Sequence, residues 1–389
     1  MKHTAFFRVT AAVVCLCMFM SAGMAHAQVL EEESPITLTS PSYMLLEADS
    51  GAVIFEKNAD ARRPVASVTK LMTALILLEK LENGEIGLND TVTVSPNAAS
   101  VIGSQALLDA HAQYPLETLL KATVMASGND SAVALAEYVA GTEEAFAVLM
   151  NEKAASLGMH GTHYVNCTGL PVEGQFTTAR DVAVLSCEVA KHEKYHEYAS
   201  VWIDTLTHPS GRTTDLTNTN RLIRFYADCD GFKTGSTNEA KYCISATAWR
   251  NGMRLIAVVL GSESSQVRFD EARAMLDYGF ATYRRYKVSE EGKLLDQYVQ
   301  VKMGGEDRVE AALGSDISLL LKSGQEKKIT FETDLMESVQ APIHQGDVLG
   351  QVNVLLDGKV IARTDAVAAK DVRLPGFLEG FMRIFDLWK

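Results

Sequence analysis

The chain has 389 residues, of which 47% are hydrophobic and 22% are charged. These fractions are typical of a folded globular protein and exclude extensive disorder, and the length is enough for two domains. The 49 acidic residues outnumber the 36 basic ones, so the net charge is −13. Because nucleic-acid binding depends on a basic surface, we expect no nucleic-acid partner.

Residues 1–27 have the pattern of a secretory signal peptide. Lys2, His3 and Arg8 precede an apolar stretch over Val9–Met20, and Ala25-His26-Ala27 supplies the small residues that precede a cleavage site. The alternative is a retained membrane helix, but the stretch is shorter than the ~20 residues that span a bilayer. We therefore expect an exported protein.

Cysteine usage leaves the redox state of the mature chain open. Two of the six cysteines fall in the signal segment, and an oxidising compartment would permit disulfides among the other four. Their spacing matches no zinc ribbon, and buried free thiols are the alternative to bridges. The four are Cys167, Cys187, Cys229 and Cys243.

Residues 28–284 mix strands and helices and are expected to form one domain. Strand-like segments at both ends of the region enclose several helices, and the turn Asn251-Gly252 indicates a hairpin near its end. This order predicts an α+β fold in which helices flank an antiparallel sheet. The predicted strands are Tyr43–Leu46, Gly51–Phe55, Lys241–Trp249 and Leu255–Gly261, and the predicted helices are Val68–Leu81, Glu117–Met125 and Ser131–Val139.

Residues 285–371 change to short alternating segments with turn signals between them. Hydrophobic residues alternate at Val299, Val301 and Met303, and strand-like segments flank the turn Asp357-Gly358. Because alternation with a period of two indicates strands with one buried face, we expect a small all-β domain. Its other strand residues are Ile329, Phe331, Val352, Val354, Val360 and Ile361.

Residues 372–389 are expected to form an amphipathic helix. Pro375 suits a helix start, and bulky apolar side chains fall on one face with charged ones on another. The segment is too short and too charged to span a bilayer, but such a helix can lie at a membrane surface. Docking on its own protein is the alternative. The apolar face consists of Phe377, Phe381, Ile384, Phe385 and Trp388.

Ser67-Val68-Thr69-Lys70 lies at the start of the first predicted helix. Residues three apart share a helix face, so the Lys70 amine can take the proton of the Ser67 hydroxyl. This requires a neutral lysine, which burial or a nearby cation supplies by lowering the pKa. The pattern is common by chance, so it needs other residues to identify a nucleophile.

Two further triplets strengthen this interpretation. Ser127-Gly128-Asn129 falls between two predicted helices, where a loop can present both polar side chains to a cleft. Lys233-Thr234-Gly235 ends a strand-like run, where a glycine lets a substrate backbone approach the strand edge. Together, in this order and context, the three motifs are a specific signal.

With these motifs the chain resembles the low-molecular-mass penicillin-binding proteins of the D-alanyl-D-alanine carboxypeptidase family. The resemblance covers nearly the whole mature chain and includes the β-domain and the terminal helix of membrane-anchored members. It implies a β-lactamase/transpeptidase-like fold at the periplasmic, extracytoplasmic face of the bacterial cytoplasmic membrane. It also implies release of the terminal D-Ala from peptidoglycan stem peptides and inhibition by β-lactams. Other matching segments include Gly161-Thr162-His163-Tyr164, Thr178-Ala179-Arg180-Asp181, Asp230-Gly231-Phe232 and Met253-Arg254-Leu255-Ile256.

The resemblance further implies a catalytic role for several residues. Ser67 would form the acyl-enzyme with Lys70 as its base, and Ser127 and Lys233 would relay the proton to the leaving D-alanine. Asn129 would hold the peptide amide of the substrate. This chemistry requires no cofactor and no metal.

The remaining implied roles concern charge and the substrate carboxylate. The backbone N–H groups of Ser67 and Ser236 would form the oxyanion hole. Thr234 and Arg268 would bind the terminal carboxylate beside Gly235. Arg268 depends on the alignment of the loop from Ser262 to Val267, and Ser236 stands at a position where members of the family vary.

Alternative enzymes share part of this pattern. A class A β-lactamase needs a glutamate in an E-x-x-L-N pattern, but Glu173 is followed by Gly174-Gln175-Phe176. A D,D-endopeptidase of the same family would use the same residues. A non-catalytic wall-binding protein is disfavoured because it has no use for a lysine-paired nucleophile.

A zinc protease is the remaining alternative. His192 and His196 satisfy the H-E-x-x-H pattern, and on one helix they could share a metal ion. They also continue the apolar stripe of Val182, Leu185 and Val189, so packing explains them as well. No third ligand follows, and we expect no metal.

Overall fold

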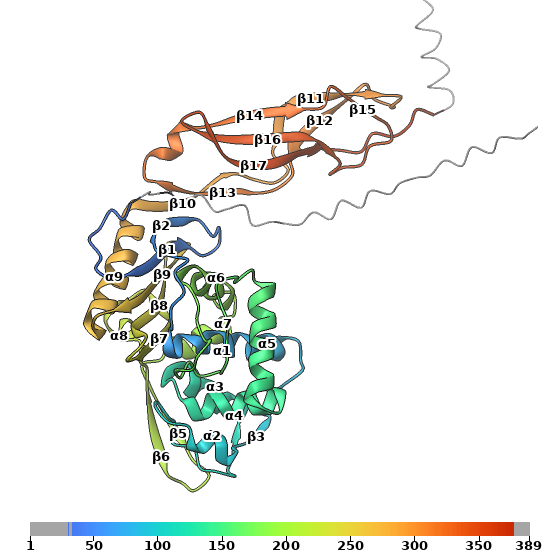
Figure 1. The fold of residues 1–389 in the computed structure, drawn as a ribbon. Helices are drawn as coiled ribbons and strands as arrows, with labels where there is room; N and C mark the ends of the chain where they lie inside the picture. The colour runs from blue at the N-terminus through green and yellow to red at the C-terminus, as the bar shows by residue number, and fades with distance from the viewer. Residues whose placement is uncertain (1–29, 31–32, 377–389) are drawn as a thin grey trace, which may run out of the picture.

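The computed structural model describes residue 30 and residues 33–376, and its central layer is a five-stranded sheet (Figure 1). The strand order is β2-β1-β9-β8-β7, and every neighbouring pair is antiparallel. The predicted α+β fold and its antiparallel sheet are confirmed. Because β7 is an edge strand, one side of its backbone has no strand partner. The strands are β1 Ser42–Glu47, β2 Val53–Lys57, β7 Cys229–Thr237, β8 Lys241–Arg250 and β9 Met253–Ser262.

Both faces of this sheet are apolar, because successive side chains of a strand point to opposite faces. Met44 and Leu46 belong to one buried cluster, whereas Tyr43 and Leu45 belong to the other. The sequence of a strand that is covered on both faces is a continuous run of apolar residues. This explains the composition of residues 43–46 and 255–260.

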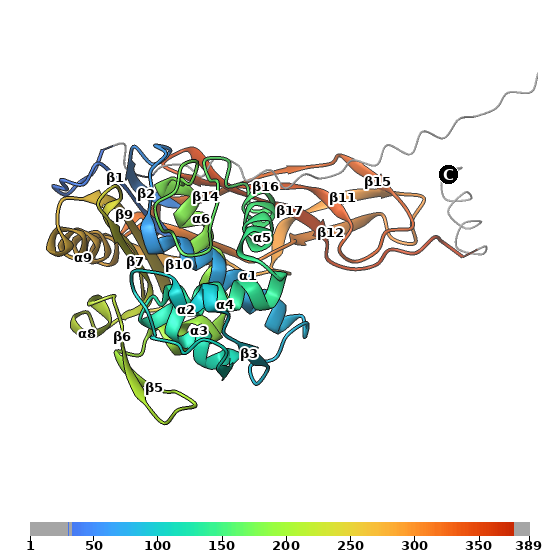
Figure 2. The ribbon, with the colours of Figure 1, turned by 60° about the horizontal axis from the view of Figure 1, so that its bottom comes forward.

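Helices cover the two faces of the sheet, as Figures 1 and 2 show from two directions. The helix α9 (Ser265–Thr282) packs on β8 and β9 on one face, and a group of helices around α1 covers the other. The other helices are α1 Lys70–Glu82, α2 Pro96–Ser100, α3 Leu116–Met125, α4 Asn129–Ala140, α5 Glu143–Ser156, α6 Ala179–Val189, α7 Glu193–Ala199 and α8 Leu222–Phe225. Two short hairpins lie among them, β3 Thr91–Thr93 with β4 Gln113–Pro115 and β5 Ile203–Thr207 with β6 Thr213–Thr217.

The central helix α1 is enclosed by its neighbours. All its residues from Lys70 to Leu78 are buried, as expected of a helix that is apolar on every side. The predicted helix over Val68–Leu81 is confirmed, but its first turn is a 3-10 helix, η1 (Ala66–Thr69). Packing of α1 therefore carries Lys70 into the core and leaves Ser67 partly exposed at its entrance.

The predicted all-β domain is confirmed by a six-stranded sheet with the order β14-β16-β17-β12-β11-β15 and by a β10–β13 pair. Val299, Val301, Val352 and Val354 are buried in it. Asp357-Gly358 has positive φ at both residues, as a two-residue hairpin turn requires. The elements are β10 Tyr283–Ser289, β11 Leu294–Lys302, β12 Arg308–Leu313, β13 Ile317–Lys322, η2 Gln325–Lys328, β14 Ile329–Leu335, β15 Ser338–Gln340, β16 Val348–Leu356 and β17 Lys359–Ala368.

One part of the predicted alternation in this domain is wrong. Met303 lies just after β11 at a positive φ of 58° and is 67% exposed. The chain turns there, so the buried face of β11 ends at Val301. Alternation therefore identified the strand but placed its end too late.

The predicted signal peptide and the residues of the terminal helix from Phe377 onward lie outside the described residues. Within the described part of that segment, Val372 still pairs with Ile343 in a β-bridge, and no helix begins by Gly376. Of the helices that the structure describes, none is both long and apolar enough to cross a membrane.

Candidate active site

Ser67 lies in η1, and two glycines let this turn pack closely against its surroundings. A Cβ atom on Gly235 would lie 2.4 Å from Val65 O and 2.8 Å from Ser67 N. Gly169 has a φ of +83°, and a Cβ atom there would lie 1.9 Å from Ala66 O. The sequence interpretation assigned the space at Gly235 to a substrate. In the structure, the neighbour that occupies this space is the Ser67 turn itself.

The Lys70 amine is buried and makes three polar contacts. Nζ lies 2.9 Å from Ser67 Oγ, 2.6 Å from Asn129 Oδ1 and 2.7 Å from Thr168 O. The amide and backbone oxygens are acceptors, so each takes an N–H from Lys70. When Lys70 is neutral it has only two N–H groups, and its lone pair then faces the Ser67 hydroxyl.

Burial of Lys70 favours this neutral amine. Burial lowers its pKa to about 7, against the opposing influence of Cys167, Asp130 and Glu143. Removing an ammonium group from water destabilises its charged form, which explains the direction of the change. The amine can therefore accept a proton near neutral pH.

Ser127 lies between α3 and α4 in a left-handed conformation, with a φ of 64°. Its hydroxyl is buried and has no hydrogen-bond partner among the described residues. A buried polar group without a partner costs free energy, and a serine at positive φ is uncommon. Both features are typical of a site that is completed by another molecule.

Asn129 and Asp130 at the start of α4 fix the chain around Ser127. Asn129 Nδ2 donates to Ile102 O at 2.6 Å while its oxygen accepts from Lys70. The buried Asp130 carboxylate accepts N–H groups of Ala106 at 2.9 Å and Leu108 at 3.0 Å. The sequence analysis missed Asp130, although an acidic residue directly after the Ser-Gly-Asn triplet was a usable signal.

Lys233 lies in the middle of β7, not at the end of a strand as predicted. Its side chain is buried, and Nζ lies 3.2 Å from Thr234 O. Burial, followed by the charges of Lys70 and Arg268, lowers the pKa of Lys233 well below its usual value. The structure thus brings two lysines, each with a weakened charge, into one site.

The other residues predicted along β7 have different exposures. Thr234 is buried and its Oγ1 donates to Thr219 Oγ1 at 2.8 Å. Ser236 is exposed at the end of the same strand. Because β7 is the sheet edge, both residues border the Ser67 turn where an extended peptide could align.

Arg268 lies on α9, which begins at Ser265, so the loop predicted over Ser262–Val267 is wrong. Its guanidinium is largely buried, and Nη1 donates to Gly235 O at 3.0 Å and to Cys243 O at 3.3 Å. Burial lowers the pKa of Arg268 to about 10, which leaves it charged at neutral pH. Its positive charge therefore lies directly beside β7.

A cavity of about 460 Å³ adjoins the Ser67 turn. Ala66 and Gly169 form its border with the turn, and Thr237 extends it along β7. Two carboxylates, Glu173 and Glu239, belong to its lining. The cavity therefore lies further along β7 than Lys233 and Thr234.

The helix predicted through His192 and His196 is wrong. α6 ends at Val189, and His192 precedes the first residue of α7. His192 Nδ1 contacts Glu82 at 2.6 Å, whereas His196 Nδ1 contacts Asp230 at 3.2 Å. Each histidine has its own partner, and the described residues contain no cluster of three metal-ligating side chains.

The four cysteines of the described chain are free thiols. Cys167 is buried beside the site, and its Sγ lies 3.1 Å from Glu143 Oε1. Burial raises the pKa of this thiol well above its usual value. Cys167 is therefore a protonated, packed side chain and does not compete with Ser67 as a nucleophile.

These elements define a class of protein: a serine enzyme whose nucleophile is paired with a buried lysine beside the edge strand of an antiparallel sheet. Residues 28–264 match the family described as D-alanyl-D-alanine carboxypeptidase. Residues 283–373 match the C-terminal domain of penicillin-binding protein 5. The chain belongs to the D-alanyl-D-alanine carboxypeptidase family.

Individual relatives extend over both domains. The chain is 36% identical over 356 residues to the D-alanyl-D-alanine carboxypeptidase DacF of Bacillus subtilis, covering 91% of each protein. It is 33% identical over 378 residues to DacC of Escherichia coli, covering 95% of this chain and 92% of that one. Penicillin-binding protein 5 from Haemophilus influenzae superposes with a TM-score of 0.79 at 30% identity, covering 88% of this chain and 99% of that one. The family resemblance inferred from the motifs is confirmed.

Proposed function

We propose that this chain removes the terminal D-Ala from peptidoglycan stem pentapeptides through an acyl-enzyme on Ser67. One observation carries the proposal: Lys70 Nζ lies 2.9 Å from Ser67 Oγ, and two carbonyl oxygens accept its N–H groups, so the lone pair of the neutral amine faces that hydroxyl. This arrangement makes Lys70 a base for one specific hydroxyl. Membership of the carboxypeptidase family supports the choice of substrate.

Acylation follows from the positions of the four polar side chains. The Ser67 proton passes to Lys70 Nζ as Oγ bonds to the carbonyl carbon of the penultimate residue. The backbone N–H groups of Ser67 and Ser236 stabilise the negative charge on the carbonyl oxygen. When the C–N bond breaks, Ser127 and Lys233 relay the proton held on Lys70 to the leaving amine, and Lys70 becomes neutral again. Water then attacks the ester while Lys70 takes one of its protons, and Lys70 returns that proton to Ser67 Oγ as the shortened peptide leaves.

The substrate would lie extended along the free edge of β7. Thr234 and Arg268 would attract its terminal carboxylate, with Gly235 between them, and Asn129 would meet its peptide amide. The part of the peptide that precedes the scissile bond would then follow β7 past Thr237 into the adjoining cavity. β-Lactams would acylate the same serine and act as inhibitors.

The organisation of the chain is that expected of an exported enzyme that acts on the cell wall. We propose a removed signal peptide over residues 1–27, a catalytic domain over 28–284, a β-domain over 285–371 and a membrane-surface helix over 372–389. The enzyme would then act on the extracytoplasmic, periplasmic side of the membrane as a peripheral protein. The amphipathic sequence of the last segment supports this attachment.

Covalent labelling tests the proposal. Purified protein incubated with labelled penicillin should carry one label, and Ser67→Ala should carry none because the nucleophilic oxygen is missing. Wild-type protein that stays unlabelled would refute the acyl-enzyme. Mass analysis of a digested pentapeptide and of a cross-linked dimeric peptide then separates carboxypeptidase from endopeptidase action, since only the former releases free D-Ala from the pentapeptide.

A further inference from the structure

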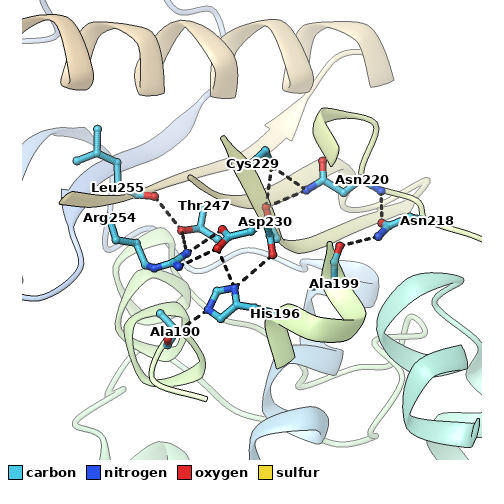
Figure 3. Close-up of polar contacts among 11 residues, drawn as sticks. Ala190, His196, Ala199, Asn218, Asn220, Cys229, Asp230, Thr247, Arg254 and Leu255 are labelled. Atoms are coloured by element: carbon cyan, nitrogen blue, oxygen red, sulfur yellow. Dashed lines mark hydrogen bonds and ion pairs between the residues drawn. The ribbon is translucent and has the colours of Figure 1, made fainter. Parts of the chain in front are cut away.

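Buried and half-buried polar side chains connect α7, the segment between β6 and α8, and the start of β7 (Figure 3). None of them belongs to the catalytic motifs. We call this set the polar brace and define it as His196, Asn218, Thr219, Asn220, Asp230 and Arg254.

The first part of the polar brace holds Asp230, three residues before Lys233. Arg254 donates to both carboxylate oxygens of Asp230, with both distances 2.8 Å. His196 Nδ1 lies 3.2 Å from one of the same oxygens. Figure 3 shows the carboxylate in contact with the side chains of Arg254 from β9 and His196 from α7. A bidentate arginine fixes the direction of a carboxylate as well as its position.

The second part holds the next two residues of β7. The pairing of β7 with β8 shifts register between Cys229 and Gly231, which is a β-bulge. At this point Asn220 Nδ2 donates to Gly231 O at 3.0 Å. The His196 ring then packs on the Phe232 ring with centroids 5.6 Å apart. A bulge redirects the side chains that follow it, and the side chains after this one are Phe232 and then Lys233.

The third part connects β7 to the segment that carries Ser127. Thr219 N donates to Met125 O at 3.1 Å, two residues before Ser127, and Thr219 Oγ1 accepts from Thr234 at 2.8 Å. Asn218 secures this segment, because its Nδ2 donates to Ala199 O at 2.8 Å. Asn218 and Asn220 are 3% and 0% exposed, so these contacts are shielded from water.

We propose that the polar brace positions Lys233 and Thr234 relative to Ser127 for the transfer of the proton to the leaving group. Its members are positioning residues that do not touch the substrate. The proposal rests on the function proposed above. It assigns a role to His196 and to the Asn218–Asn220 segment, which no sequence motif explained.

Turnover per active site is the measurement that separates positioning from folding. Active sites are first counted with labelled penicillin, and kcat and KM for a pentapeptide are then measured per labelled site. Asn220→Ala should lower kcat about tenfold or more with little change in KM, since small misplacements of catalytic groups are costly. His196→Ala, at a less buried position, should lower kcat less, and His196→Asn should recover most of it because its side-chain amide can still donate to Asp230.

The matched control is the neighbouring pair of Arg250 and Asp228. Arg250 donates to Asp228 at 2.6 Å, just before β7, but its guanidinium lies against Phe280 of α9. Asp228→Asn should therefore leave kcat per labelled site unchanged. Normal kcat per site in both His196→Ala and Asn220→Ala, or an equal loss in Asp228→Asn, would overturn the proposal. If Asn220→Ala does not fold, the kcat values of His196→Ala and His196→Asn alone test the proposal. Absence of labelling in the wild type would instead refute the proposed function.

Discussion

The catalytic region from β1 to α9 and the β-domain from β10 to β17 differ in what they bury. The catalytic region buries charged side chains, among them Lys70, Lys233 and Asp130. In the described β-domain, the buried polar side chains are Ser289 and Thr364. Burial of charge costs free energy unless partners compensate for it, so its concentration in one region marks where the chemistry lies.

The packing of the two regions differs in the same way. The catalytic sheet has an extensive apolar cluster on each face, whereas the β-domain has two small clusters. A large core can hold strained and unpaired groups such as Ser127 in place. The β-domain carries no such group that the chemistry requires.

The largest expected effect concerns the buried lysine of the catalytic region. Lys70→Arg should slow acylation by labelled penicillin about a thousandfold, because a guanidinium stays charged and cannot accept the Ser67 proton. Rapid-quench labelling measures the rate, and circular dichroism checks the fold. A rate within tenfold of the wild type would contradict the role of Lys70 as the base.

The pH dependence of acylation should reflect the same group. Burial lowers the pKa of Lys70 to about 7, so the fraction of neutral amine falls as the pH drops below that value. Acylation should then slow by about tenfold for each further pH unit. Labelling rates across the neutral range measure this, with thermal melts at each pH to exclude unfolding. A flat profile on the acidic side of neutrality would contradict the assignment.

Gly169 and Gly141 have the same φ but different surroundings. Replacing each by alanine therefore separates the cost of steric crowding from the cost of backbone strain. Gly169→Ala should lower the free energy of unfolding by about 3 kcal/mol, because the methyl group would overlap Ala66 O. Gly141 also has a φ of +83° but no atom near its Cβ direction, so Gly141→Ala should cost only about 1 kcal/mol. Urea unfolding measures both. Equal losses would show that the Ser67 turn is not tightly packed.

The smallest effect on activity is expected from the core of the β-domain. Val354 is fully buried there, and Val354→Ala should lower the stability of that domain by about 2 kcal/mol. Penicillin labelling should stay within twofold of the wild type, since no described catalytic contact comes from the β-domain. Hydrogen exchange measures the loss of stability. A parallel loss of labelling would mean that the two regions are coupled.

Sequence patterns were sufficient where the determining contacts are local. The helix over Val68–Leu81 follows from its apolar spacing, and the hairpin around Asn251-Gly252 follows from its turn residues and its apolar strands. The spacing of Ser67 and Lys70 likewise places their side chains together. In each case the relevant neighbours are within a few positions along the chain.

Contacts between backbone groups that are far apart in the sequence could not be predicted from sequence patterns. The acceptor of Lys70 at Thr168 is a carbonyl oxygen, so no side-chain pattern reports it. The break between α6 and α7, which leaves α7 packed on α3 and β7, was not visible in the spacing of His192 and His196. The need for a residue without a Cβ atom at position 235 comes from the 3-10 turn η1, which packs against it. Such features need the three-dimensional arrangement.

The free thiols of the described chain have a practical consequence. No disulfide joins Cys167, Cys187, Cys229 and Cys243, so the fold needs no oxidant to form and no isomerase to correct it. Burial raises the pKa of Cys229 to about 12 and of Cys243 to about 11, so both stay protonated and slow to react near neutrality. Reducing and oxidising surroundings alike should leave this catalyst intact.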